Sequence, residues 1–190
     1  MMEYQIIPLP KTEWKNTPVL IRYTTDEYYD LEMSSGSGFF EAKIVKKKFD
    51  VPVTHSPEEY DYPDCLYQEH WVKAEAFGIV GEKDGKKELL ACIEICPEDW
   101  SNRLIVTELW VSDGLQRQGI GTRLMNLAKD RAKRQGNRAI ILETQSCNVR
   151  AIAFYQSQGF ELIGFDSCCY SNRDIARHEV RFNFGYFLHG

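Results

Sequence analysis

The strongest constraint on the fold is a short turn with two glycines, residues 116–122, which reads Gln-Arg-Gln-Gly-Ile-Gly-Thr. Residues 104–111 before it form a mostly apolar run typical of a buried strand, and residues 120–135 repeat apolar side chains at helical spacing. A strand that turns directly into a helix leaves the first N–H groups of that helix without acceptors, and the helix dipole adds positive charge there. The turn is therefore predicted to hold an anion. Gly119 and Gly121 leave room for a pyrophosphate to approach the backbone.

Two other phosphate-binding loops are excluded by their spacing. A Walker loop requires Lys after its last glycine, and Thr122 stands there instead. The dinucleotide fingerprint G-x-G-x-x-G is also absent from this junction. The pattern Q-x-x-G-x-G is a weak signal when taken alone, because an ordinary strand–helix turn often contains two glycines.

A second motif follows the next apolar run. Residues 148–160 read N-x-x-A-x-x-F-Y-x-x-x-G-F. Together the two motifs resemble the GCN5-related N-acetyltransferase (GNAT) superfamily, whose members use acetyl-CoA, and the resemblance extends over residues 74–165. Within that superfamily, residues 143–148 and 169–172 are similar to the streptothricin acetyltransferase group. Residues before 74 share no motif with the family.

Length and composition predict one soluble domain. The 190 residues are enough for one sizeable core, and the shares of hydrophobic (43%) and charged (27%) residues are those of a globular protein. We expect a single N-acetyltransferase domain over residues 1–190. Within it we expect a less defined N-terminal part (1–72), an acetyl-CoA-binding core (73–165) and C-terminal strands (166–190).

The net charge of the chain limits the kinds of partner that it is expected to bind. The net charge of −5 argues against a nucleic-acid partner, which normally meets a basic surface, and permits a cationic small molecule. The start of the chain lacks the basic and apolar parts of a signal peptide, and no apolar run approaches the ~20 residues of a membrane span. The sequence therefore predicts a cytoplasmic protein without a membrane partner, and a homodimer is compatible with it.

The cysteines and histidines give no sign of a metal site. The six cysteines contain no C-x-x-C pair, and none of the four histidines lies at metal-ligand spacing from them. Cys92 and Cys96 would share one face of a strand, as core thiols do. Cys168 and Cys169 are adjacent and do not easily form a disulfide with each other. We expect free, mostly buried thiols and no metal.

The N-terminal third gives weaker signals. Residues 25–33 fit either a short helix or a loop between strands, and residues 39–49 fit a strand whose lysine-rich half is a solvated face. Residues 51–64 are rich in proline and acid, and we expect a long loop with a short helix in its second half. This loop reads either as a solvated connector or as an acidic flap near a cationic substrate.

The order of the remaining elements predicts an α/β fold of the α+β type. We expect strands at residues 74–82, 88–96, 104–111, 138–144, 160–165 and 179–187, and helices at 120–135 and 149–158. The first three strands are joined by short turns, including Asp-Gly at 84–85, and should be antiparallel neighbours. A helix connects the third strand to the fourth, so these two should be parallel. The GNAT-like result is a mostly antiparallel central sheet with helices on both faces, in which the one parallel pair splays to form a cofactor cleft.

The resemblance also implies where acetyl-CoA binds. Its pantetheine arm would pair with the backbone of the third strand, and its pyrophosphate would meet the N–H groups of the glycine turn. The implied cofactor-binding residues are Leu109, Trp110, Val111, Gln116, Arg117, Gln118, Gly119, Ile120, Gly121, Thr122, Asn148 and Tyr155.

Three residues are candidates for the chemistry. By resemblance, Tyr155 is the general acid that protonates the leaving thiolate of coenzyme A; without the resemblance it reads as a core tyrosine. Either Glu108 or Glu143 could accept the proton of the acceptor amine, directly or through water. Carboxylates in such apolar strands are costly to bury without a partner, so a buried salt bridge explains them nearly as well.

The sequence thus predicts an enzyme that transfers the acetyl group of acetyl-CoA to a primary amine. The expected acceptor is a small, cationic molecule, and the resemblance points to a streptothricin-like antibiotic. Two alternatives stay open. One is a non-catalytic module that binds acyl-CoA, and the other is a protein or peptide N-acetyltransferase.

Overall fold

The computed structural model describes residues 4–59 and 64–188, and the chain forms two compact units. The first unit comprises Met1–Ile21, Pro57–Leu142 and Tyr186–Gly190, and the second comprises Arg22–Ser56 and Glu143–Gly185. Among the described residues, no helix combines the length and the apolar character that crossing a bilayer requires.

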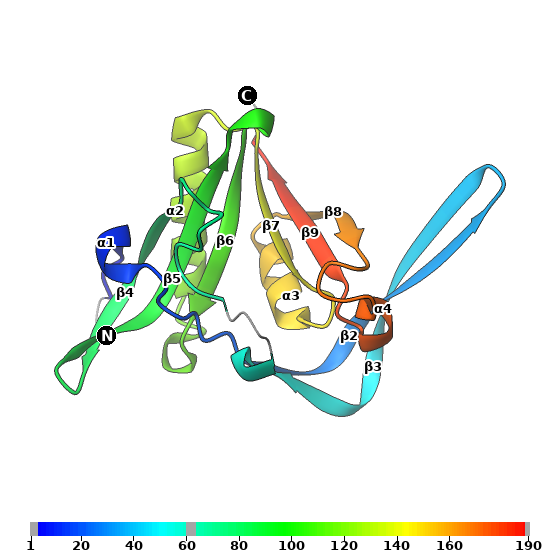
Figure 1. Ribbon diagram of the computed structural model, residues 1–190, viewed down its shortest axis with the longest axis horizontal. Helices are drawn as coiled ribbons and strands as arrows, with labels where there is room; N and C mark the ends of the chain where they lie inside the picture. The colour runs from blue at the N-terminus through cyan, green and yellow to red at the C-terminus, as the bar shows by residue number, and fades with distance from the viewer. Residues whose placement is uncertain (1–3, 60–63, 189–190) are drawn as a thin grey trace. The chain divides into compact units, whose positions relative to one another are not determined.

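The first unit is built on strands in the order β1-β4-β5-β6-β7. Figure 1 labels β4 to β7 of this order. These strands are β1 (Ile7–Leu9), β4 (Glu75–Lys83), β5 (Lys86–Glu98), β6 (Arg103–Val111) and β7 (Ala139–Gln145). Neighbours from β1 to β6 are antiparallel, whereas β6 and β7 are parallel because helix α2 (Ile120–Gln135) connects them. The predicted α/β fold, mostly antiparallel with one parallel pair, is confirmed.

The turns between these strands follow from local chemistry. Asp84 and Gly85 join β4 to β5, and their φ angles of 54° and 72° are both left-handed. Two left-handed residues in a two-residue turn match the twist of the strands, as expected for Asp-Gly. Two short 3-10 helices follow, η2 (Asp99–Ser101) before β6 and η3 (Asp113–Leu115) after it.

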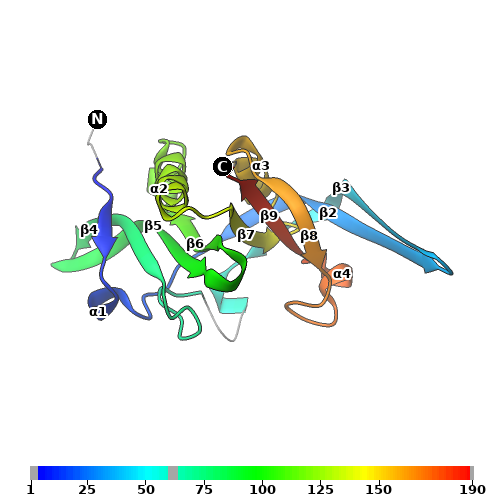
Figure 2. The ribbon, with the colours of Figure 1, turned by 90° about the horizontal axis from the view of Figure 1, so that it is seen from above.

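Two layers cover the strands of the first unit (Figure 2). Helix α2 lies on one face and buries Ile120, Leu124, Met125, Ala128 and Ala132. The short helix α1 (Lys11–Trp14) and neighbouring segments cover the other face. The apolar cluster on that side contains Leu9, Trp14, Val19, Leu66, Tyr67, Ala76 and Cys92. Residues 9–19 therefore supply part of the core of the first unit.

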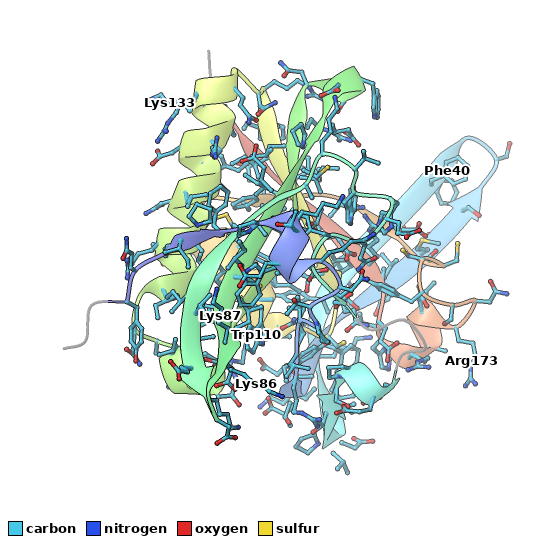
Figure 3. The ribbon with its side chains drawn as sticks, turned by 60° about the vertical axis from the view of Figure 1, so that its left-hand side comes forward. Phe40, Lys86, Lys87, Trp110, Lys133 and Arg173 are labelled. Atoms are coloured by element: carbon cyan, nitrogen blue, oxygen red, sulfur yellow. The ribbon has the colours of Figure 1, made fainter. Side chains whose placement is uncertain are left out.

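The second unit contains a long hairpin formed by β2 (Tyr23–Gly36) and β3 (Phe39–His55), with Phe40 near its tip (Figure 3). Residues 25–33, expected as a helix or loop, and residues 51–55, expected as a loop, are therefore strand. Cross-strand ion pairs explain the difference: Lys46 lies 2.9 Å from Glu27, and Lys47 lies 2.6 Å from Asp30.

The end of the expected acidic loop is only partly visible in the fold. A short 3-10 helix, η1 (Pro57–Glu59), follows β3. Residues 60–63 of the loop lie outside the described residues.

The rest of the second unit contains an aromatic cluster. It contains α3 (Val149–Ser157), β8 (Glu161–Asp166), α4 (Asp174–Arg177) and β9 (Arg181–Phe187). β8 and β9 are antiparallel. The ring of Tyr155 lies 6.2 Å from the rings of Phe160 and Phe184, measured between centroids.

Candidate functional site

Strand β6 changes its pairing part-way along its length. Its registered pairs with β7 run from Arg103–Ala139 to Ile105–Ile141. Its antiparallel pairs with β5 continue to Val111. The backbone of residues 109–111 thus has no β7 partner among the described strand pairs, and an extended ligand could add to that side as another strand would. Trp110, labelled in Figure 3, packs against the apolar cluster of the first unit.

A β-bulge lies in β6 just before this stretch. Glu108 pairs with Glu94 of β5, whereas Val106 pairs with Ile95, so Thr107 is the extra residue. The Thr107 hydroxyl donates to Glu94 Oε1 at 2.8 Å. The expected site residue Glu108 is therefore buried in the strand, with 7% of its surface exposed, at a distortion of the backbone.

The glycine turn leads from β6 into α2 with two residues in the left-handed region. Arg117 has a φ of 60° and Gly119 a φ of 78°. An added Cβ at Gly119 would meet no atom within 4 Å, so the conformation, not crowding, is what favours glycine there. Left-handed residues directly before a helix start are the kind of backbone geometry that can direct N–H groups toward an anion.

Side chains of the turn stabilise it through hydrogen bonds to its own backbone and side chains. The Gln116 amide donates to the carbonyl of Val111 at 3.1 Å and to Asp113 Oδ1 at 3.0 Å. The Gln118 amide donates to the carbonyl of Gly114 at 3.0 Å. Both glutamines therefore hold the turn in shape. The remaining expected phosphate-site residues, Ile120, Gly121 and Thr122, form the first turn of α2.

In the second unit, Glu143 on β7 is engaged by two other side chains. The Tyr170 hydroxyl donates to Glu143 Oε2 at 2.8 Å, and Arg181 Nε lies 3.2 Å from the same oxygen. Glu143 therefore forms a salt bridge, but an exposed one, with about 40% of both side chains accessible, rather than the buried salt bridge considered from the sequence. The other candidate base, Glu108, belongs to the first unit.

Helix α3 carries the other two expected site residues of the second unit. The side chain of Asn148 accepts a hydrogen bond from the N–H of Ala151 at 3.2 Å and so caps the helix, as predicted. Tyr155 is 9% exposed, and its ring is held among aromatic neighbours. A ring fixed in this way presents its hydroxyl in one direction.

One further polar cluster was missed by the sequence reasoning. Cys147 Sγ lies 3.6 Å from His55 Nε2, and His55 Nδ1 lies 3.8 Å from Glu179 Oε1. The Tyr23 hydroxyl lies 3.3 Å from Cys147 Sγ and donates to Gln145 at 2.6 Å. His55 and Tyr23 are paired residues at the base of the hairpin, which local sequence patterns could not bring together with residues 145–179.

Cys147, His55 and Glu179 are arranged like a nucleophile, its base and the acid that orients the base, but the thiol is unsuited to attack. Cys147 is fully buried, and burial raises the pKa of its thiol to about 11. Among the described residues, no group of three or more His, Cys, Asp and Glu side chains is arranged to hold a metal ion. The cluster therefore reads as a buried polar contact between the hairpin base and the segment before α3.

Another missed residue is Glu94, a carboxylate with no exposed surface in the middle of β5. Besides the bond from Thr107, its Oε2 accepts the N–H of Tyr67 at 2.6 Å. Burial raises the pKa of Glu94, and these two hydrogen bonds oppose that shift. A single acid within the apolar run 91–96 was the available signal in the sequence.

Comparison with known proteins identifies the family. Residues 41–160 match the acetyltransferase (GNAT) family. The chain belongs to this family. The resemblance drawn from the two motifs is thereby confirmed, and the matched region contains the glycine turn, Glu108, Glu143, Asn148 and Tyr155.

Similar proteins include named N-acetyltransferases. The chain is 37% identical over 71 residues to streptothricin acetyltransferase of Streptomyces lavendulae, a match that covers 37% of this chain and 38% of that protein. It is 36% identical over 80 residues to N-acetyltransferase 8 of Homo sapiens, covering 42% of this chain and 35% of that protein. The chain thus spans well under half of the length of these curated relatives.

Solved structures are similar over nearly the whole chain. The crystal structure of a nourseothricin acetyltransferase has a TM-score of 0.73 at 23% identity and covers 97% of this chain and 98% of its own. A candidate streptothricin acetyltransferase from Bacillus anthracis, solved with acetyl coenzyme A, has a TM-score of 0.70 at 21% identity and covers 99% of both chains. At these identities the likeness shows a shared fold.

The burial of the thiols predicts their reactivity. In the native protein at about pH 7.5, the exposed Cys168 and Cys169 should react with a disulfide reagent before the buried Cys92, Cys96 and Cys147, which should react only after unfolding. The hydrogen bond with Asp166 raises the pKa of Cys168, so Cys168 should react more slowly than a free thiol would. Replacing Cys168 and Cys169 by Ser should remove the fast phase. Native labelling of Cys147 at a rate similar to that of Cys168, mapped by mass spectrometry, would contradict its assignment as a structural thiol.

Proposed function

We propose that this chain is an acetyl-CoA-dependent N-acetyltransferase that acts on a primary amine of a small cationic acceptor. The observation that carries the proposal is the course of β6. Its pairing with β7 ends early, it contains a bulge at Thr107, and it leads into a left-handed turn at the start of α2. Family membership supports the same conclusion.

In this proposal acetyl-CoA lies along β6. The pantetheine amides pair with the backbone of Leu109, Trp110 and Val111, in the manner of an added strand. The pyrophosphate accepts hydrogen bonds from the N–H groups of residues 117–122 and is stabilised by the α2 dipole. Gln116 acts by holding the turn rather than by contributing charge.

The proposed reaction moves one acetyl group and two protons. Glu108 takes a proton from the acceptor ammonium, directly or through water, and the neutral amine attacks the thioester carbonyl. The tetrahedral oxyanion collapses, the C–S bond breaks, and Tyr155 protonates the thiolate of coenzyme A. The nitrogen loses its second proton as the amide forms, and this proton restores Tyr155 through solvent. We assign the base role to Glu108 because it lies on β6 at the bulge, directly before the residues proposed to pair with the pantetheine arm.

The acceptor class rests on charge and on the relatives. Proteins similar to this chain are named for streptothricin and nourseothricin, and we propose an acceptor of that cationic class. The net charge of −5 favours the approach of a cation. The alternatives are a module that binds acyl-CoA without turnover and an enzyme that acetylates proteins or peptides.

The first prediction concerns the turn. Gly121→Val places a branched side chain against the proposed pyrophosphate site, and acetyl-CoA affinity measured by calorimetry should fall by about tenfold or more. Gly164→Val on β8 is the control, because an added Cβ at Gly164 meets no atom within 4 Å. Equal affinity in the Gly121 variant and the parent would argue against a pyrophosphate at this turn.

The second prediction concerns the acid. Tyr155→Phe keeps the ring and its packing but removes the hydroxyl, so kcat should fall roughly 10²–10⁴-fold while acetyl-CoA affinity changes little. Tyr170→Phe removes a hydroxyl that bonds Glu143 instead, and its kcat should stay within about threefold of the parent. A Tyr155→Phe enzyme as fast as the parent would leave Tyr155 as a core residue.

The third prediction tests the function and the acceptor class. Thiol release from acetyl-CoA is followed with a streptothricin, a polyamine, a monoamine and a peptide as acceptors. The kcat/KM should be highest for the polycations and should decrease with added salt most steeply for them, because opposite charges raise the encounter rate. Binding of acetyl-CoA without thiol release for any acceptor would favour the non-catalytic module, and a preference for the peptide would favour a protein acetyltransferase.

A further inference from the structure

Glu94 joins two parts of the first unit that are distant in the sequence. Its carboxylate has no exposed surface and accepts hydrogen bonds from two different segments. Oε1 accepts the hydroxyl of Thr107 at 2.8 Å, and Oε2 accepts the N–H of Tyr67 at 2.6 Å. Thr107 is the extra residue of the β6 bulge, and Tyr67 lies in the segment before β4. One side chain therefore links the bulge to a segment of the apolar cluster of the first unit.

Tyr67 is itself held in place at the other end of this link. Its side chain is buried, and its φ of 60° is left-handed. The Tyr67 hydroxyl accepts the N–H of Ala76 on β4 at 3.0 Å and donates to the carbonyl of Leu9 on β1. Leu9 and Ala76 are registered partners, so the hydroxyl bridges the pair β1–β4. The N–H that Glu94 accepts thus comes from a fixed point in the fold.

An acid is a costly side chain at position 94. The run 91–96 is otherwise apolar, and burial raises the pKa of Glu94, whereas the hydrogen bonds from Thr107 and Tyr67 lower it. An apolar side chain of similar size would avoid the cost of desolvation. It could not accept the Thr107 hydroxyl or the Tyr67 N–H, however. These two hydrogen bonds are therefore what the acid contributes at this position.

The bulge lies toward the acetyl end of the proposed cofactor site. In the proposed function the pyrophosphate meets residues 117–122 and the pantetheine arm pairs with residues 109–111, so the thioester points back along β6 toward Thr107. A bulge bends its strand and changes where the neighbouring side chains and backbone groups point. A misplacement of about 1 Å at a reacting group can cost roughly 10²-fold in rate. Whatever fixes the bulge therefore also fixes the geometry of the transfer.

We propose that Glu94 is a positioning residue for acetyl transfer: by holding the Thr107 hydroxyl and the Tyr67 N–H together, it fixes the β6 bulge and so orients the thioester end of acetyl-CoA. This inference rests on the proposed function, in which acetyl-CoA lies along β6. Glu94 has no exposed surface, so it acts through the strand and not by touching the acceptor. It acts through its two hydrogen bonds, and its charge is not required.

The first test separates rate from binding. Thr107→Val keeps the shape of the side chain and removes the hydroxyl, so kcat with the best acceptor of the panel should fall about 10–10²-fold. Acetyl-CoA affinity measured by calorimetry should change less than about threefold, because most of the proposed cofactor contacts lie beyond the bulge. Thr107→Ser retains the hydroxyl and should restore kcat to within about threefold of the parent. A Thr107→Val enzyme as fast as the parent, or a Thr107→Ser enzyme as slow as Thr107→Val, would overturn the proposal.

Thr25→Val is a matched control in the second unit. The Thr25 side chain is buried, and its hydroxyl donates to the carbonyl of Glu27 at 2.6 Å, next to the register shift of the β2–β3 pair. This variant therefore also loses a buried hydroxyl hydrogen bond at an irregular strand position. Both variants should lower Tm, but only Thr107→Val should lower kcat. Losses of kcat that follow the losses of Tm in both variants would show a role in stability alone and would overturn the proposal.

Substitutions of Glu94 separate its hydrogen bonds from its charge. In Glu94→Gln the amide oxygen can accept the Tyr67 N–H and the amide nitrogen can donate to the Thr107 hydroxyl, so kcat should stay within about threefold of the parent. Glu94→Leu removes both links and should be as slow as Thr107→Val. The double variant Glu94→Leu/Thr107→Val should be no slower than the slower single variant, because both changes break the same link. A Glu94→Gln enzyme as slow as Glu94→Leu, or losses that multiply in the double variant, would overturn the proposal.

Amide hydrogen exchange followed by NMR gives a readout that does not depend on turnover. In Thr107→Val and Glu94→Leu, the amides of residues 107–111 should exchange about tenfold faster than in the parent and in Thr25→Val, because the bulge opens more often. Unchanged exchange in the folded variants would overturn the proposal. Failure of the parent to acetylate any amine of the panel would overturn the proposed function instead, and the exchange rates would then decide alone whether Glu94 holds the bulge.

Discussion

Backbone hydrogen bonding along β6 determines where the proposed chemistry takes place. The strand pairs with β5 over its whole length but with β7 only near its start, up to Ile105. A strand in the middle of a sheet normally has both rows of backbone groups satisfied, so a strand that loses one neighbour needs another partner. In a family that uses acetyl-CoA, the pantetheine amides are the natural partner, and the strand then delivers the thioester to a defined place.

The bulge at Thr107 adds a second effect at the same position. An extra residue in one strand rotates the side chains that follow it, and here it brings an acid of β6 opposite an acid of β5. Buried carboxylates destabilise an ordinary core unless they are hydrogen-bonded. At this distorted strand the hydrogen bonds of Glu94 connect the bulge to Tyr67, so the buried acid of β5 contributes to the geometry of the strand.

The sequence was sufficient for the central part of the fold because local signals and tertiary structure agree there. Asp84-Gly85, the helical spacing after Gly119 and the cap at Asn148 each correspond to the observed geometry. The β2–β3 hairpin was not recognised because charged residues that pair across strands, such as Lys47 with Asp30, carry no apolar alternation. Contacts such as Tyr67 with Glu94 and His55 with Cys147 join distant segments, and no local pattern encodes them.

The outer part of the hairpin has a separate consequence for how this chain can vary. Residues 32–36 of β2 and 39–43 of β3 are all exposed, and they pair only with each other in the described structure. Insertion or deletion of one residue in each strand would preserve their mutual register while leaving every buried position unchanged. The length of the hairpin tip can therefore differ between related chains. The length of its base, where Tyr23 stacks on His55, is constrained by contacts with buried residues.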